Sequence, residues 1–207
     1  MIQKLYLWAC ERLYHELAWS YDTVSLIVSA GGWPAWRRLA LELAPDGPLL
    51  ELGFGTGALL AEGATAGRSI VGLDLSRAMH RVAARRLAGV EPKPPRVESP
   101  AQALPFADGS FTGVIATFPA PYILDPVTLA ECRRVLRPGG QFIIVGLWVT
   151  AHRDGWQRWL PVFYGEPAAT QVEQMTQRVR AAGFAVSWER RRVEWAEVGV
   201  LVGSRGE

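Results

Sequence analysis

The chain has 207 residues, of which 49% are hydrophobic and 20% are charged, and its formal net charge at pH 7 is +2. This length suits one packed domain, and the composition excludes a disordered chain. The small net charge argues against a nucleic-acid-binding protein, since such proteins concentrate basic residues on one face. Cys10 and Cys132 lie far apart without metal-ligand spacing, so we expect reduced cysteines, a cytoplasmic location and no metal site.

Residues 1–45 are predicted to form a helical cap. Apolar residues recur there at roughly helical spacing, namely Leu5, Trp8, Leu13 and Leu17. Charged residues interrupt them, so we expect no signal peptide, and no run reaches the roughly 18 apolar residues of a membrane-spanning helix. Trp33 and Pro34 are predicted to open a later helix of the cap, because proline fits the first helical turn.

Strands and helices then alternate along the chain. The predicted strands cover 49–53, 69–73, 96–98, 114–117 and 141–147, and the predicted helices cover 57–66, a segment opened by Ser76, 126–136 and 170–182. Two final segments, 185–193 and 197–203, predict an antiparallel hairpin. Repeated strand–helix units favour a parallel sheet with helices on both faces. The predicted fold is therefore α/β: a Rossmann-like, doubly wound, mostly parallel seven-stranded sheet with an antiparallel C-terminal hairpin and an N-terminal helical cap.

A glycine-rich loop follows the first predicted strand. Glycine stands at every second position, at Gly53, Gly55 and Gly57, and it can adopt positive φ and let the backbone lie against a ligand. The next strand ends in Asp74, whose carboxylate can accept both hydroxyls of a ribose. These features predict a site for an adenosine-containing cofactor. With Ala58 the spacing also fits the dinucleotide fingerprint, which keeps a nicotinamide-dependent oxidoreductase as an alternative.

Four segments decide between the two cofactors. They are ELGFGTG at 51–57, GLDLS at 72–76, ALPF at 103–106 with GSF at 109–111, and ECRRVLRPGG at 131–140. In this order they resemble the class I S-adenosylmethionine-dependent methyltransferases, within them the group of ubiquinone and menaquinone C-methyltransferases. The last two segments are not expected of nicotinamide enzymes. The resemblance covers roughly residues 20–147 and implies S-adenosyl-L-methionine as cofactor and S-adenosyl-L-homocysteine as product.

The resemblance also implies cofactor contacts. The predicted cofactor-binding residues are Tyr21, Glu51, Gly53, Phe54, Gly55, Gly57, Asp74, Leu75, Ser76, Met79, Ala101, Gln102 and Thr117. Glu51 is expected near the charged methionyl end of the cofactor, or else its only role is to order the loop. Leu75 is expected to pack on the adenine face. Tyr21 resembles a tyrosine that closes over the methionyl end in relatives, although it and Met79 also fit plain core packing. Asp74→Ala is expected to weaken cofactor binding without lowering the stability of the cofactor-free protein.

The chain departs from its relatives at two positions. Pro100 stands where relatives carry an aspartate that binds the adenine amino group. The backbone of Ala101 or the amide of Gln102 can substitute. Thr112 stands where an aspartate usually follows Phe111. A catalytically inactive relative that still binds the cofactor therefore stays open as an alternative.

The acceptor is expected to be a small, apolar or aromatic molecule. His152 and Tyr122 follow strand ends and are the candidate catalytic bases, although a lone histidine in a loop is more often a surface residue. Seven of the nine tryptophans lie in the cap and in the segment 148–169, which interrupts the alternation like an insertion. They fit an aromatic substrate pocket under a lid, a patch that docks on a membrane, or ordinary packing. The sequence does not specify the oligomeric state.

The simplest domain organisation is a single methyltransferase domain over 1–207. Within it we expect the cap over 1–45, a cofactor-binding core over 46–147, the substrate-side insertion over 148–169, and a helix with the C-terminal hairpin over 170–207.

Overall fold

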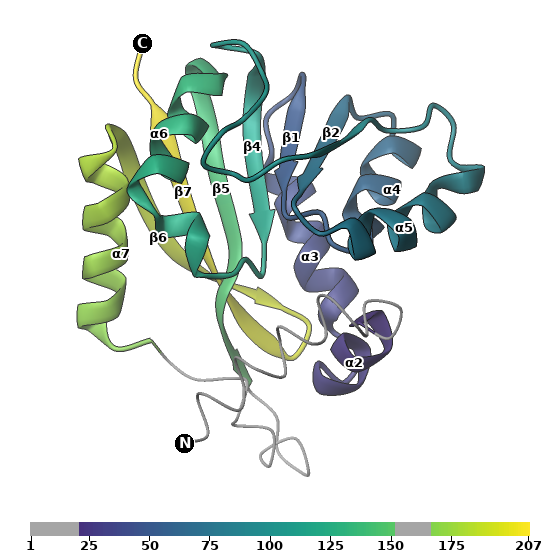
Figure 1. Cartoon of the computed structure of the whole chain (residues 1–207). Coiled ribbons are helices and arrows are strands. Elements are labelled where there is room, and N and C mark those ends of the chain that lie inside the picture. Colours follow the sequence, from purple (N-terminus) through teal and green to yellow (C-terminus); the bar gives the residue numbers. More distant parts are fainter. Residues whose placement is uncertain (1–20, 152–166) are drawn as a thin grey trace.

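The computed structural model describes residues 21–151 and 167–207 (Figure 1). The helices are α2 (Tyr21–Val28), α3 (Trp33–Leu43), α4 (Ala58–Thr65), α5 (Arg77–Arg86), α6 (Pro126–Val135) and α7 (Ala169–Ala181), with short 3-10 helices η2 (Leu87–Gly89) and η3 (Pro121–Leu124). The strands are β1 (Leu49–Leu52), β2 (Ile70–Asp74), β3 (Arg96–Glu98), β4 (Phe111–Thr117), β5 (Leu136–Ala151), β6 (Phe184–Val193) and β7 (Ala196–Arg205).

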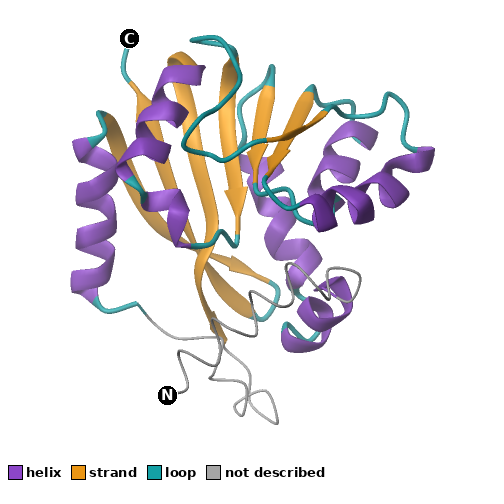
Figure 2. Ribbon diagram, viewed as in Figure 1, coloured by secondary structure: helices purple, strands orange, loops and turns teal. Residues whose placement is uncertain are grey.

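The strands form one seven-stranded sheet in the order β3-β2-β1-β4-β5-β7-β6 (Figure 2). The first five strands in this order run parallel to one another. Strand β7 runs antiparallel to both β5 and β6. This confirms the predicted α/β fold and its C-terminal hairpin. The chain winds from β1 toward β2 and β3, then returns to place β4 on the other side of β1. Ligands of such sheets bind beyond the carboxyl ends of the strands at this reversal, between β1 and β4.

Helices cover both faces of the sheet, as predicted (Figure 1). Because side chains alternate along a strand, Leu49 and Leu50 point to opposite faces. Leu49 belongs to a buried cluster that includes Trp36 of α3 and residues of α4 and α5. Leu50 belongs to a second buried cluster that includes residues of α6 and α7. Because both apolar layers pack against the sheet, they fix the positions of the loops that follow β1, β2 and β4.

Three predicted strand boundaries differ from the structure by three residues or more. Strand β4 begins at Phe111 rather than at 114. Strand β5 begins at Leu136 rather than at 141 and continues to Ala151, beyond the predicted end at 147. The register of β5 against β7 shifts between Val145 and Val149, and pairing then resumes as far as Ala151. Gly146, with φ of +84°, lies in this irregularity. Residues 148–151 therefore belong to the sheet, and the rest of the predicted insertion up to 166 lies outside the described residues.

The cap is described from Tyr21 onward, and it contains α2 and α3. Pro34 lies in the first turn of α3, as predicted. Trp36 is fully buried and packs on Trp195, with ring centroids 5.1 Å apart, so this tryptophan serves ordinary packing. The predicted helix before residue 21 and the tryptophans at 8, 19, 156 and 159 lie outside the described residues. Across 21–151 and 167–207, the structure contains no helix of the length and apolarity that crossing a bilayer requires.

Candidate functional site

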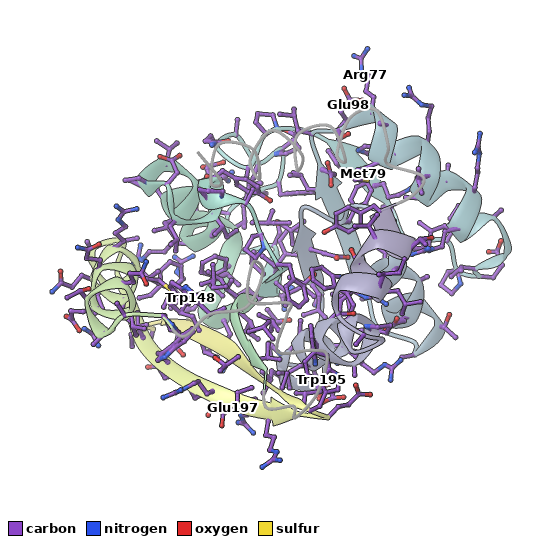
Figure 3. The ribbon with its side chains drawn as sticks, turned by 90° about the horizontal axis from the view of Figure 1, so that it is seen from below. Arg77, Met79, Glu98, Trp148, Trp195 and Glu197 are labelled. Carbon is purple, nitrogen blue, oxygen red and sulfur yellow. The ribbon has the colours of Figure 1, made fainter. Side chains whose placement is uncertain are left out.

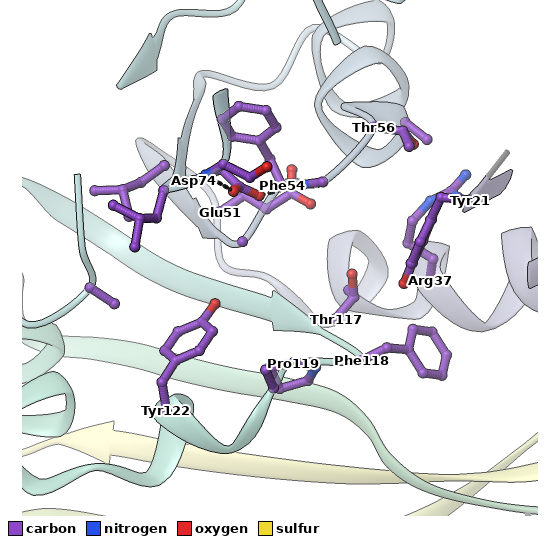
Figure 4. Close-up of a pocket in the computed structure, with 18 of the residues that line it drawn as sticks. Tyr21, Arg37, Glu51, Phe54, Thr56, Asp74, Thr117, Phe118, Pro119 and Tyr122 are labelled. Atoms are coloured by element: carbon purple, nitrogen blue, oxygen red, sulfur yellow. Dashed lines mark hydrogen bonds between the residues drawn. The ribbon is translucent and has the colours of Figure 1, made fainter. Parts of the chain in front are cut away.

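A cavity of about 620 Å³ lies at the carboxyl ends of β1, β2 and β4 (Figure 4). Its walls come from α2, α3, the glycine loop after β1, the turn after β2, and the loops after β3 and β4. The predicted residues that line it are Tyr21, Glu51, Gly53, Phe54, Gly55, Asp74, Leu75, Ser76, Ala101, Gln102, Thr117 and Tyr122. Segments far apart in the sequence thus meet at the position expected for a nucleotide-type ligand.

Gly57 and Met79 are the predicted cofactor residues that do not line the cavity. Gly57 has φ of +75°, and a Cβ there would lie 2.8 Å from Cβ of Ala83. Its lack of a side chain therefore lets the start of α4 approach α5. Met79 is fully buried and turns inward from the helix on which Arg77 points outward to Glu98 (Figure 3). Both residues support the site through packing.

Asp74 holds the glycine loop in place. Its Oδ2 accepts a hydrogen bond from the amide of Gly55 at 2.8 Å, and its Oδ1 accepts one from the amide of Ser76 at 2.8 Å (Figure 4). Gly53 and Gly55 have φ of +69° and +54°, a backbone region that side chains disfavour. Two backbone amides thus fix the Asp74 carboxylate in the wall of the cavity, and its contact with ribose hydroxyls stays a prediction. Leu75, 64% exposed beside it, presents apolar surface that a flat ligand can cover.

Glu51 is a buried carboxyl group in the wall of the cavity. The residue is 2% exposed, and its Oε2 has no hydrogen-bond partner within the described part of the chain. Burial raises the pKa of Glu51 to about 8, with Arg37 opposing this shift and Asp74 and Glu62 adding to it. At neutral pH the carboxyl group therefore holds its proton, and a cation placed beside it would favour the charged form.

Arg37 of α3 lines the same cavity and was not predicted. Its Nη2 donates a hydrogen bond to Oε1 of Glu62 on α4, and Arg38 donates from Nε to the other oxygen of Glu62 at 3.4 Å. One carboxylate thus serves two guanidinium groups. The side chain of Arg37 is only 12% exposed, and its Nε has no partner among the described residues. Glu62 lies 25 positions from Arg37, so no local sequence pattern indicated this contact.

A second unpredicted group joins α2 to the glycine loop. Asp22 accepts a hydrogen bond at Oδ1 from the hydroxyl of Thr56 at 2.8 Å. Arg86 of α5 donates to the same hydroxyl at 3.0 Å and forms an ion pair with Asp22. This arrangement, which we call the α2 latch, consists of Asp22, Thr56 and Arg86. The position of Thr56 inside the glycine loop was the one signal available in the sequence.

An aromatic wall closes the cavity opposite Asp74. The rings of Trp33 and Phe118 stack with centroids 3.8 Å apart and planes 23° apart, and Tyr21 meets the edge of Trp33 at 6.4 Å. Phe118 follows β4 directly and has a φ of +47°. Gly146 makes room for it, since a Cβ at this glycine would lie 2.3 Å from Cε1 of Phe118. Trp33 therefore lines the cavity, and its contact with a substrate stays a prediction.

Of the two candidate bases, Tyr122 lies in the cavity and His152 lies outside the described residues. The phenol oxygen of Tyr122 reaches over the glycine loop, because a Cβ at Gly53 would lie 2.6 Å from it. Gly53 must therefore lack a side chain for Tyr122 to occupy this position.

Pro100 and Thr112, the two positions at which the chain departs from its relatives, lie in different parts of the structure. Pro100 lines the cavity together with Ser99, whose hydroxyl donates to the carbonyl of Ala103 at 2.8 Å and still has lone pairs to offer. Thr112 instead donates from its hydroxyl to the carbonyl of Pro48 at 3.0 Å. Thr112 thus fastens β4 to the turn before β1, and it is absent from the cavity lining.

Comparison with known proteins identifies the family. A family model described as a methyltransferase domain matches residues 50–144. The demethylmenaquinone methyltransferase of Thermus thermophilus is 31% identical, and the match covers 86% of this chain and 93% of that enzyme. The chain belongs to the S-adenosylmethionine-dependent methyltransferases. Demethylmenaquinone methyltransferases of Mycolicibacterium gilvum and Renibacterium salmoninarum match at 29% and 34% identity, covering 85% and 64% of this chain and 86% and 56% of those enzymes.

Solved methyltransferase structures share the fold. An S-adenosylmethionine-dependent methyltransferase from Methanosarcina mazei superposes with a TM-score of 0.59 at 18% identity, covering 79% of this chain and 94% of that one. The phosphoethanolamine N-methyltransferase 2 of Haemonchus contortus, in complex with S-adenosylhomocysteine, gives 0.61 at 15% identity, covering 86% and 54%. As a member of the family, this methyltransferase uses S-adenosylmethionine, and neither comparison supports the nicotinamide-dependent alternative. Two carboxyl groups in the cavity wall fit that cofactor. The carboxylate of Asp74 suits ribose hydroxyls, and the buried carboxyl group of Glu51 suits a cationic group.

Proposed function

We propose that this methyltransferase transfers a methyl group to a planar, apolar, quinone-type acceptor of the demethylmenaquinone class. The single observation that carries the proposal is the Trp33–Phe118 stack, which faces the glycine loop across one cavity. Flat aromatic walls bind flat aromatic ligands by burying apolar area and by offset stacking. The acceptor in the names of the 29–34% identical relatives supports the same chemistry.

On the donor side, S-adenosylmethionine supplies an electrophilic methyl group when it is bound. We assign Asp74 to the ribose hydroxyls, Gly53 and Gly55 to backbone contact, and Glu51 to the methionyl ammonium. The remaining donor contacts are assigned to Tyr21, Phe54, Leu75, Ser76, Ala101, Gln102 and Thr117, with Gly57 and Met79 in supporting positions. Positioning of this kind accounts for much of the rate of a displacement reaction, about 7–11 kcal/mol in favourable intramolecular models.

On the acceptor side, Trp33 and Phe118 hold the ring plane, and Tyr122 lies between this wall and the glycine loop. A ring carbon that accepts a methyl group must release one proton. Tyr122 and His152 stay the predicted bases for that proton, and a positioned base contributes roughly 10²–10⁴-fold.

The proposal is tested by measuring S-adenosylhomocysteine release with a reduced short-chain demethylmenaquinone analogue, alongside phenols and amines of similar size. We expect turnover with the quinol, and an increased KM for it in Phe118→Ala at unchanged S-adenosylhomocysteine affinity. Trp188→Ala is the control, because Trp188 packs on Trp148 and is absent from the cavity lining. Turnover of only the phenols or amines would refute the acceptor class, and equal loss of donor and acceptor binding in Phe118→Ala would refute the role of the wall.

Two predictions about the surroundings of the enzyme stay open to experiment. We propose a cytoplasmic location, with membrane contact as the route to an apolar acceptor. Leu26 and Ile27 of α2 are 48% and 66% exposed and would form the contact surface. Co-sedimentation of the wild type, but not of a Leu26→Ser/Ile27→Ser variant, with lipid vesicles would support it.

A further inference from the structure

Two segments that stand out in the sequence, ALPF at 103–106 and ECRRVLRPGG at 131–140, meet in the structure away from the cavity. Arg134 of α6 donates hydrogen bonds to the carbonyls of Leu104 at 2.9 Å and Phe106 at 2.7 Å. In return, Oε2 of Glu131 accepts a hydrogen bond from the amide of Leu104 at 2.7 Å. We call Glu131 and Arg134 the α6 clasp. Neither residue belongs to the cavity lining in the described part of the chain, so the clasp acts on the loop rather than on a ligand.

The clasp has a fixed geometry. Nε and Nη2 of Arg134 donate to the two carboxylate oxygens of Glu131 at 2.7 and 2.8 Å, and such a bidentate pair restricts the orientation of both groups. The hydrogen bond from Arg134 lowers the pKa of Glu131, burial opposes this shift, and the amide of Leu104 adds to it. Glu131 is therefore ionised at neutral pH. The apolar face of α6 is buried against the sheet, so the helix holds the clasp in one place.

The residue that the clasp holds follows directly on a turn in the cavity wall. Residues 99–102 line the cavity. The amide of Ala103 donates to the carbonyl of Pro100 at 3.1 Å and closes the turn, and the hydroxyl of Ser99 donates to the carbonyl of Ala103 at 2.8 Å. Both bonds tie this wall to Ala103, next to Leu104. The connection from β3 to β4 runs across the sheet toward α6 (Figure 1). The position of the wall therefore depends on where α6 holds Leu104.

The turn offers a ligand mainly backbone polar groups. Pro100 has neither an N–H group nor a polar side chain, and Ala101, 5% exposed, has only its peptide groups. Because peptide groups are planar and the turn is closed, these groups cannot reorient independently of the loop. Hydrogen bonds weaken steeply when distance or angle departs from the optimum. Recognition by this turn therefore requires the loop to be held in position.

We propose that the α6 clasp positions the 99–103 wall for the adenine base of the methyl donor, so that Glu131 and Arg134 control base selectivity from outside the cavity. This rests on the proposed assignment of Ala101 and Gln102 to the donor. Glu131 and Arg134 are positioning residues, since they act through Leu104. Arg134 binds two carbonyls and a carboxylate at once, which a planar guanidinium fork allows and a lysine ammonium does not.

Calorimetry with two bases tests the proposal. The ligands are S-adenosylhomocysteine and S-inosylhomocysteine, in which a carbonyl oxygen replaces the adenine amino group. We expect the wild type to prefer the adenine ligand by at least about 10-fold, the effect of one well-placed hydrogen bond. Arg134→Gln should weaken S-adenosylhomocysteine binding about 10-fold and reduce the preference by roughly 3-fold or more, as misplacement of binding groups does. Glu131→Gln keeps an acceptor oxygen for Leu104 and should show the same changes at smaller size.

Arg133→Gln is the matched control. Arg133 is the exposed neighbour of Arg134 on α6, and its guanidinium donates to the carbonyl of Gly183 at 3.4 Å. Both affinities and their ratio should stay as in the wild type. A merely structural role of Arg134 predicts a lower free energy of unfolding with an unchanged ratio of the two affinities, so urea unfolding accompanies each titration.

Several outcomes would overturn the assignment. They are unchanged S-adenosylhomocysteine affinity in folded Arg134→Gln, and equal weakening of both ligands. If Arg134→Gln fails to fold, Glu131→Gln must show the reduced preference. If both fail, hydrogen exchange in the wild type decides: the amides of Ala103 and Leu104 must be protected before any ligand is added, and rapid exchange refutes the clasp.

The binding measurements use no acceptor, so a wrong acceptor class leaves their outcome unaffected. A wild type that binds both bases equally would refute the placement of adenine against this wall, and the proposal with it. Failure of the proposed methyl transfer to a quinol is therefore distinguishable from failure of the α6 clasp.

Discussion

The carboxylate of Asp22 lies 2.8 Å from the hydroxyl of Thr56 and accepts its hydrogen bond. This contact joins α2 to the glycine loop after β1. Arg86 of α5 completes the α2 latch by binding both Thr56 and Asp22. The latch involves exposed and half-buried side chains, for Arg86 and Asp22 are 32% and 37% exposed. Its expected effect is on the position of α2 more than on the stability of the whole fold.

Asp22→Ala should therefore release α2 without unfolding the domain. Partly exposed ion pairs contribute up to about 1 kcal/mol, so we expect a small decrease in the free energy of unfolding, faster amide exchange in α2, and weaker S-adenosylhomocysteine binding. Thr56→Val should act in the same direction. Hydrogen exchange and calorimetry measure these effects, with Thr23→Ala, an exposed neighbour, as the control. Unchanged exchange in α2 would contradict the role of the latch.

Asp74→Ala should lower both cofactor affinity and the stability of the cofactor-free protein. The sequence suggested the first effect alone. The structure adds the second, because the carboxylate accepts hydrogen bonds from Gly55 and Ser76, and bonds to charged groups contribute about 1.5–3 kcal/mol each. Urea unfolding of the cofactor-free protein tests this, with Asp46→Ala, an exposed acid, as the control. An unchanged unfolding midpoint would show that other contacts hold the loop.

Glu51 makes the stability of the cofactor-free protein depend on pH. Its pKa is raised from 4.5 to about 8 by burial, against the opposing Arg37 and with additions from Asp74 and Glu62. Between these values the folded chain holds a proton that the unfolded chain has released. The free energy of unfolding therefore falls as pH rises, by at most about 1.4 kcal/mol per pH unit, and levels off above the folded pKa.

Glu51→Gln should remove this slope. We expect the variant and the wild type to diverge increasingly in stability as the pH rises from 5 to 8, with the variant the more stable at pH 8. Glu42→Gln, which alters an exposed acid of α3, should follow the wild type throughout. Parallel curves for Glu51→Gln and wild type would mean that Glu51 titrates near its ordinary value.

Gly146→Ala should disturb the aromatic wall. The new Cβ would lie 2.3 Å from the ring of Phe118, and φ at this residue is +84°, a region that costs an L-residue roughly 1–2 kcal/mol. We expect lower stability and a higher KM for the acceptor, with unchanged S-adenosylhomocysteine affinity. Gly139→Ala is matched to it, since Gly139 has φ of +74° but open space around its Cβ. An equal change in acceptor KM in both variants would refute the effect through Phe118.

The glycine loop and Asp74 could be predicted because their signals are local. A short apolar strand, alternating glycines and an acid at the next strand end specify their own geometry, and the structure brings them together at the cavity. The alternation of strands and helices likewise predicted the sheet and the faces that its helices cover, because burial requires that periodicity.

Arg37 and Asp22 could not be predicted because their partners are distant in sequence. Glu62 lies 25 positions from Arg37, and Thr56 and Arg86 lie 34 and 64 positions from Asp22. Such contacts depend on the distances between packed helices, which no local pattern contains. The predicted end of β5 at 147 was wrong because the strand continues beyond an irregularity in its pairing. Gly146 accommodates Phe118 at this irregularity, and β5 pairs with β7 again from Val149 to Ala151.

The Trp33–Phe118 stack joins a helix that precedes the sheet to a loop in its middle, and neither element carries Asp74 or the glycine loop. Exchanging these two rings for smaller or larger ones would alter the width of the cavity at the aromatic wall and leave Asp74 and the glycine loop unchanged. Under the proposed placement of the acceptor against this wall, acceptor preference can therefore diverge, in evolution or by protein engineering, without changes to the residues that we propose to bind the methyl donor.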